Sequence, residues 1–200
     1  TSLKGCPSGK VLFTIFSLLI FWQIFLGKVN LNSNLLVSFY PVFGKNLPYK
    51  NIIGLDQLRL YFPNYTLIIE SFKNFSLPFW NPYIFAGNLN IASLQSAVFY
   101  PLNIFGLILP KIEFWHLLRI SPLVMGGFFM YLYLKNLRLF WLAAFFGGLS
   151  FGFSPFILSW GEEQVIIPHA VVWLPVILLC IDKLSEVGTP KNVFFRKFCF

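Results

Sequence analysis

The feature that most constrains this chain is a set of four long apolar runs, at residues 11–29, 113–134, 139–160 and 164–182. An α-helix needs about 20 mostly apolar residues to cross the roughly 30 Å of hydrocarbon in a bilayer. Each run comes close to that length. The sequence therefore predicts an all-α integral membrane protein with about four transmembrane helices.

Composition supports the same class. Hydrophobic residues make up 57% of the chain and charged residues 11%, whereas soluble domains carry about 25% charged residues. Intrinsic disorder requires low hydrophobicity and high charge, so it is excluded. The net charge of +8 does not indicate nucleic-acid binding, because the basic residues flank the apolar runs and no recognition motif is present.

The basic residues also predict the orientation of the chain. They form three clusters beside the apolar runs: Lys4 and Lys10; Lys135 and Arg138; and Lys183, Lys191, Arg196 and Lys197. Because Lys and Arg are retained on the cytoplasmic side, residues 1–10 and 183–200 are predicted to be cytoplasmic. The long loop 30–112 and the turn before the fourth run are then on the outer face.

The two ends of the sequence suggest a longer protein. The chain begins at Thr1 and stops inside a new aromatic run at residues 193–200. We therefore expect residues 183–200 to lead into a further span, and the chain to be an N-terminal part.

The outer loop is predicted to contain amphipathic helices on the membrane surface. In residues 63–75, apolar side chains recur at helical spacing, and Pro63 is suited to a helix start. A second, shorter helix is predicted for residues 91–99, ended by Pro101. Such helices place an apolar face at the headgroup boundary.

Polar residues that could carry chemistry gather at the predicted outer face. They are Asp56 and Arg59 in the loop; Glu113, His116 and Arg119 at the start of the second span; and Glu162, Glu163 and His169 around the last outer turn. Each has a simpler structural interpretation. Arg119 could extend its cation to the headgroups or bind an anion. Asp56 could be a solvated loop acid or a helix cap, the two Glu a soluble turn, and His169 a packed helix-end residue.

Other motifs carry less information. Trp80, Tyr83, Phe85, Phe99 and Tyr100 could stack on a sugar or anchor the loop at the interface. The three cysteines show no metal or redox spacing, and no phosphate loop, dinucleotide fingerprint or zinc-spaced set occurs. No metal site is indicated by the sequence, and a divalent metal requirement is left open.

Two stretches of the outer loop resemble the bacterial YfhO family of membrane proteins. They read Leu77-Pro-Phe-Trp-Asn-Pro-Tyr-Ile-Phe-Ala-Gly-Asn88 and Ser93-Leu-Gln-Ser-Ala-Val-Phe-Tyr-Pro-Leu-Asn103. The segments Asp56-Gln-Leu-Arg-Leu-Tyr-Phe-Pro63 and Ala170-Val-Val-Trp-Leu-Pro175 are also similar to that family's patterns. The turn Gly161-Glu-Glu-Gln164 departs from the Gly-His-Pro-like turn of many members, which argues against a family site there.

The resemblance implies a GT-C-type glycosyltransferase fold with a cytoplasmic N-terminus in the bacterial inner membrane. It implies a polyprenyl-phosphate sugar as donor and an envelope glycan or lipid as acceptor. Asp56 matches the acidic loop residue that commonly serves as catalytic base or metal-site residue in that fold. A carboxylate can deprotonate an acceptor hydroxyl, and Arg59 or Arg119 could hold the departing phosphate. His116, Trp80, Asn81, Glu162 and His169 complete the predicted substrate-binding set.

Two other functions stay open at this point. A transporter or flippase for a lipid-linked precursor would show paired broken helices in repeated halves, and no internal repeat is visible in the sequence. A non-catalytic assembly factor of the envelope would use the loop only as a docking surface, so that Asp56, Arg59 and Arg119 would all be dispensable.

Overall fold

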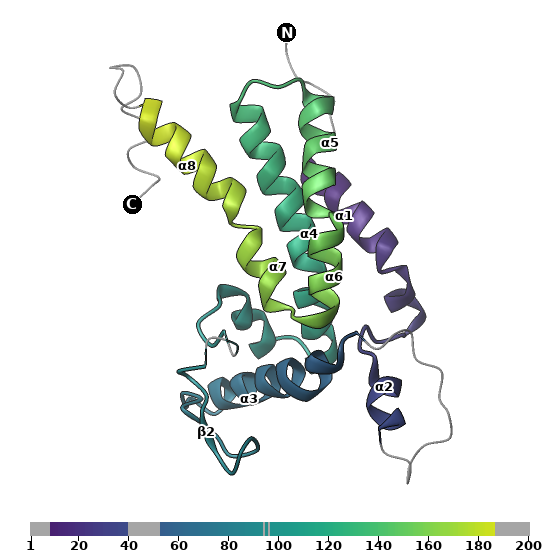
Figure 1. The fold of residues 1–200 in the computed structure, drawn as a ribbon, viewed down its shortest axis with the longest axis vertical. Helices are drawn as coiled ribbons and strands as arrows, with labels where there is room; N and C mark the ends of the chain where they lie inside the picture. The colour runs from purple at the N-terminus through teal and green to yellow at the C-terminus, as the bar shows by residue number, and fades with distance from the viewer. Residues whose placement is uncertain (1–8, 40–52, 94, 96, 187–200) are drawn as a thin grey trace. The chain divides into compact units, whose positions relative to one another are not determined.

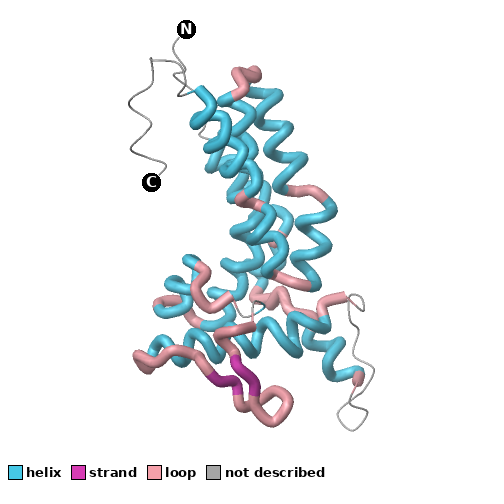
Figure 2. The backbone as a smooth tube through the Cα atoms, turned by 60° about the vertical axis from the view of Figure 1, so that its left-hand side comes forward, coloured by secondary structure: helices cyan, strands magenta, loops and turns pink. Residues whose placement is uncertain are grey.

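A computed structural model describes residues 9–39, 53–93, 95 and 97–186. The predicted cytoplasmic positions at 1–8 and 187–200, and loop residues 40–52, lie outside the described residues. The structure is mostly helical, and among these residues the strands form one short hairpin (Figure 2). The fold class predicted from the apolar runs is confirmed at this level.

Three helical stretches are long and apolar enough, by length and composition, to cross a membrane: Lys111–Asn136, Trp141–Glu163 and Ile166–Ser185. They correspond to the second, third and fourth predicted spans, and they support a membrane protein. The first apolar run differs from the prediction. Its α-helix, α1, covers only Gly9–Ile20, and a 3-10 helix, η1, follows at Trp22–Leu26. At about 1.5 Å per residue α1 alone is too short for the hydrocarbon, so the count of four spans stays a prediction.

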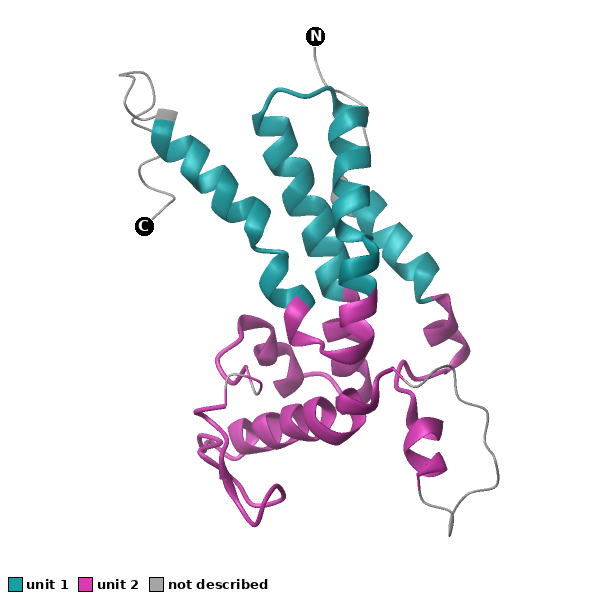
Figure 3. Cartoon of the chain, viewed as in Figure 1, with its two compact units in different colours: residues 1–21, 121–158, 168–200 teal, residues 22–120, 159–167 magenta. Residues whose placement is uncertain are grey.

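The chain divides into two compact units, which Figure 3 shows in different colours. The span unit comprises residues 1–21, 121–158 and 168–200, and the loop unit comprises residues 22–120 and 159–167. Helices α4 (Lys111–Asn136) and α6 (Pro155–Glu163) contribute residues to both. We describe each unit separately.

The span unit contains α1, the later part of α4, α5 (Trp141–Gly152), the start of α6, most of α7 (Ile166–Val171) and α8 (Leu174–Glu186) (Figure 1). Glycines bring α4 and α5 into close contact. A Cβ atom at Gly148 would stand 2.5 Å from the carbonyl oxygen of Gly127, and one at Gly152 would stand 2.5 Å from the Gly127 nitrogen. Small residues allow helices in a membrane to approach closely in this way.

Proline accounts for the interruptions in the last two helical stretches. Helix α5 ends at Gly152, and α6 restarts at Pro155, with the Ser154 hydroxyl accepting the Ile157 N–H at 3.4 Å. A second break separates α7 from α8, whose second residue is Pro175. Because proline lacks an N–H and is tolerated in the first turn of a helix, each break precedes a proline.

The loop unit contains α2 (Ser33–Ser38), η2 (Gln57–Tyr61), α3 (Phe62–Lys73), the β1–β2 hairpin (Trp80–Asn81 and Asn88–Leu89) and η4 (Pro101–Leu107), with the start of α4 and the end of α6. In the hairpin Trp80 pairs with Leu89 and Asn81 with Asn88, antiparallel. The core consists of aromatic and aliphatic side chains from four segments: Tyr61, Tyr65, Ile69, Phe114, Trp115, Leu118 and Val165.

Helix α3 confirms the helix predicted for residues 63–75, and it buries Tyr65, Ile68 and Ile69 as their spacing suggests. It ends at Lys73 rather than at residue 75, because Phe75 has a left-handed backbone (φ 53°) and a fully exposed ring. The helix predicted for residues 91–99 is wrong: the described residues there contain no α-helix, and the 3-10 helix η4 begins at Pro101 instead. Whether α3 lies on a membrane surface stays a prediction.

Candidate functional site

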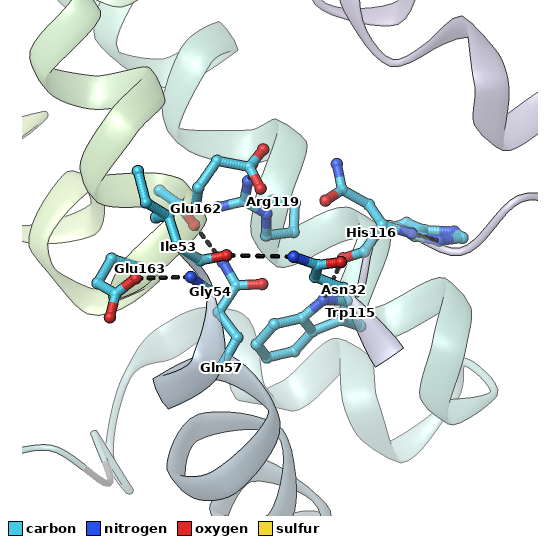
Figure 4. A network of polar contacts seen from close by, with 11 residues as sticks. Asn32, Ile53, Gly54, Gln57, Trp115, His116, Arg119, Glu162 and Glu163 are labelled. Carbon is cyan, nitrogen blue, oxygen red and sulfur yellow. Dashed lines mark hydrogen bonds and ion pairs between the residues drawn. The ribbon is translucent and has the colours of Figure 1, made fainter. Parts of the chain in front are cut away.

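A network of polar contacts in the loop unit joins four segments that are far apart in the sequence. They are residues 30–32, residues 53–57, the first turns of α4 and the last turn of α6. Figure 4 shows these segments converging on one region, with Arg119, Glu162 and Glu163 close to Gly54. We refer to this set as the polar network.

Arg119 and Glu162 form an ion pair in this network. The guanidinium Nη2 lies 2.8 Å from Glu162 Oε1, and the Arg119 side chain is only 3% exposed. A buried cation is costly unless it is paired, so Glu162 provides the counter-charge. Two interpretations were left open for Arg119: extension to the headgroups and binding of an anion. The structure shows a buried guanidinium that is engaged by the Glu162 carboxylate.

Glu163 and Gly161 anchor the segment around Asp56. The Glu163 carboxylate accepts the backbone N–H of Gly54 at 2.6 Å, and the Gln57 side-chain amide donates to the Gly161 carbonyl oxygen at 2.5 Å. Gln57 is 2% exposed. The two Glu residues of the turn are therefore structurally engaged, and the interpretation of this turn as merely a soluble one does not hold.

The start of α4 binds the segment that follows the first apolar run. The Trp115 indole N–H donates to the Asn30 carbonyl oxygen at 3.0 Å, and His116 Nε2 accepts the Asn30 N–H at 3.4 Å. Asn32 extends this segment toward residue 53, since its amide donates to the Ile53 carbonyl oxygen at 3.4 Å. His116 thus holds the backbone of residue 30 within the network.

Asp56 and Arg59 lie where the chain enters a π-helix. Asp56 is the residue preceding η2, a π-helix at Gln57–Tyr61 that includes Arg59. Asp56 is half-buried, and its carboxylate makes no hydrogen bond or ion pair with another of the described residues. Arg59 is exposed, with its guanidinium 5.4 Å from the centre of the Phe39 ring. π-Helical turns are rare and are frequent at functional sites.

The Tyr61 hydroxyl is buried near the negative charges of Asp56 and Glu163, and both effects raise its pKa. Tyr61 is 1% exposed, and its pKa is raised, first by burial and then by the negative charges of Asp56 and Glu163. The carboxylates of Asp56 and Glu163 are thus both within electrostatic range of one buried phenol. The phenol stays protonated and can only act as a neutral hydrogen-bonding group.

Four of the predicted substrate-binding residues lie outside the polar network, and Arg59 in η2 is one of them. Asn81 is buried in the hairpin, where its amide donates to Asn64 of α3 at 3.0 Å and its oxygen accepts the Tyr83 N–H at 3.0 Å. Trp80 is half-exposed and lies against Gly87, where no side chain would fit. His169 is buried in α7 and belongs to the span unit, so it is a packed histidine there.

Several residues of the network were not singled out by sequence reasoning: Asn30, Asn32, Gly54, Gln57 and Trp115. Most of them act through backbone groups or through one amide, for which a single sequence offers no pattern. Among the described residues, no group of three or more His, Cys, Asp or Glu side chains is placed to hold a metal ion.

Comparison with models of known protein families, with curated proteins and with solved structures finds no match to this chain.

Proposed function

We propose that this chain belongs to a membrane glycosyltransferase that takes a sugar from a polyprenyl-phosphate donor and transfers it to an envelope glycan or lipid. The single observation that carries the proposal is the state of the three acids near η2. Glu162 is neutralised by Arg119, and Glu163 holds the Gly54 N–H. Asp56 has no such partner among the described residues, so it is the carboxylate left to accept a proton.

The proposed reaction uses two side chains: Asp56, which precedes η2, and Arg59, which lies within it. Asp56 takes the proton from the acceptor hydroxyl as the oxygen attacks the sugar. The bond between the sugar and the lipid phosphate breaks, and the phosphate leaves with the bonding electrons. Arg59 is the exposed cation, and it stabilises that departing anion. Arg119 does not take this role, because its charge is already balanced by Glu162.

The test is transfer by the full-length protein in membranes supplied with a labelled polyprenyl-phosphate sugar and an envelope extract as acceptor. Asp56→Asn keeps the size of the side chain and removes the base, so we expect release of label to fall by about 100-fold or more, since a general base typically contributes about 100- to 10,000-fold. Glu70→Gln, at an exposed acid of α3, is the matched control and should release label as wild type does. Full activity of Asp56→Asn would refute the proposed base.

A second function, transport of a lipid-linked precursor, is favoured by one observation in the span unit. Both of its interrupted helical stretches pack their breaks against Gly126 of α4: a Cβ there would lie 3.0 Å from Val172 and 3.4 Å from Gly152. Broken helices are typical of transporters. In the same assay, label that crosses the bilayer but stays on the lipid would favour transport. If the label is neither released from the lipid nor moved across the bilayer, with acceptor present, the non-catalytic assembly role is favoured.

A further inference from the structure

We propose that Glu163 is a positioning residue, which fixes the Asp56 carboxylate by holding the backbone on its N-terminal side. This inference rests on the proposed function, and it concerns how the last turn of α6 controls that site. Nothing in the sequence relates residue 163 to residue 56, and their association comes from the fold.

The first step is the pair of anchors on either side of Asp56. Glu163 accepts the N–H of Gly54 at 2.6 Å, two residues before Asp56. Gln57, the residue after Asp56, donates to the carbonyl oxygen of Gly161 at 2.5 Å. A hydrogen bond to an ionised carboxylate is about twice as strong as one between neutral groups. Asp56 is therefore held between two points, both fixed to residues 161–163.

The second step is the backbone conformation of Gly54, which allows its N–H to reach the Glu163 carboxylate. Gly54 has φ +97°, a conformation that side chains with a Cβ rarely adopt, and a Cβ there would stand 3.0 Å from the Glu162 carbonyl oxygen. Glycine allows both the left-handed turn and the close approach. The N–H of residue 54 can reach Glu163 because no side chain separates the two backbones (Figure 4).

The third step is the support of the turn itself. Glu162 is paired with the buried guanidinium of Arg119 at 2.8 Å, which ties the end of α6 to α4. Adjacent acids thus have separate tasks: Glu162 holds the turn in place, and Glu163 holds the Asp56 segment. Within the loop unit, the position of Asp56 depends on a chain of contacts from α4 through α6.

A base misplaced by about 1 Å can cost about 100-fold in rate, so the loss of this anchor has a measurable consequence. Glu163→Gln keeps an oxygen that accepts the Gly54 N–H, whereas Glu163→Ala removes it. Glu70→Ala is the matched control for the alanine change, since Glu70 is also an acid of the loop unit and is exposed.

The experiment measures two quantities on the full-length protein in membranes: kcat for sugar transfer, and amide hydrogen exchange of residues 54–61. We expect Glu163→Ala to lower kcat by about 10- to 100-fold with little change in KM, and to speed exchange at residues 54–61. Glu163→Gln should keep kcat within a few-fold of wild type with protected amides, and Glu70→Ala should change neither quantity.

Two results would overturn the inference. If Glu163→Gln is as inactive as Asp56→Asn while its amides stay protected, Glu163 takes part in the chemistry and is not a positioning residue. If Glu163→Ala leaves the exchange of residues 54–61 unchanged, the anchor does not exist. Absence of transfer by the wild-type protein would refute the proposed function, and the exchange measurement would still decide whether Glu163 fixes the Asp56 segment.

Discussion

Different kinds of interaction stabilise the interior of each of the two units. In the span unit, α4 and α5 meet through glycines, and Phe13 of α1 stacks on Phe145 with ring centres 5.2 Å apart. In the loop unit, distant segments are joined by an ion pair and by hydrogen bonds to backbone groups. Close packing of small and aromatic residues suits helices in lipid, where hydrophobicity does not drive association. Directional polar contacts suit a region that has to fix single side chains in space.

The largest expected effect is in the span unit and tests whether backbone contact holds it. Gly148→Leu places a side chain where a Cβ alone would be 2.5 Å from a backbone oxygen, and a backbone in contact cannot move aside cheaply. We expect a loss of about 3 kcal/mol in stability, measured as a lowered midpoint of thermal unfolding of the full chain in detergent. Ala143→Leu, at an exposed position of the same helix, should change the midpoint little. Equal effects of the two variants would break the comparison.

The next effect is in the loop unit and concerns the ion pair. Arg119→Ala removes the partner of Glu162 in this ion pair. Breaking a fully buried pair in this way costs about 3 kcal/mol or more. We expect a smaller loss here, because the Glu162 side chain is 28% exposed. Glu70→Gln removes one partner of the Lys111–Glu70 pair, whose side chains are about half exposed, and should cost less than about 1 kcal/mol. Chemical denaturation measures both. A larger loss for Glu70→Gln would contradict the role given to burial.

The smallest effect sharpens the contrast between the network and the hairpin. Asn81→Ala removes the hydrogen bonds to Asn64 and to the Tyr83 N–H, for a loss of about 1–2 kcal/mol. Because these bonds tie the hairpin to α3, we expect the loss to appear as faster proteolysis near Tyr83. Exchange of the Gly54 amide should stay unchanged. If that amide also loses protection, the hairpin and the polar network form one cooperative region.

Much of the helical framework followed from periodicity and proline placement. Residues 113–134 gave a helix close to the observed Lys111–Asn136, and the apolar spacing of Tyr65, Ile68 and Ile69 gave the buried face of α3. These signals are local and repeat along the chain. Nothing in the first run, residues 11–29, marks the change from α-helix to 3-10 helix after Ile20, and its role as a span stays a prediction.

The candidate site was only partly predictable. Arg119 and Glu162 were chosen as charges at one membrane face, and the structure pairs them. Their pairing was not visible, because 43 positions separate them and topology alone assigns only a shared side. Gly54 acts through its backbone N–H, whereas Glu163 and Gln57 act through side chains that bind backbone groups of distant residues. Every residue carries such backbone groups, so no pattern along the sequence indicates these partners.

The sequence by itself determined that this protein is helical and suited to a membrane, because apolar length and the scarcity of charge leave no other stable arrangement of its backbone. Only the tertiary structure decided how the acids differ: Glu162 pairs with Arg119, whereas Glu163 binds the Gly54 N–H. That distinction depends on distances of about 3 Å between residues far apart in the chain. Such distances are set by how the segments pack, and no pattern along the sequence encodes them.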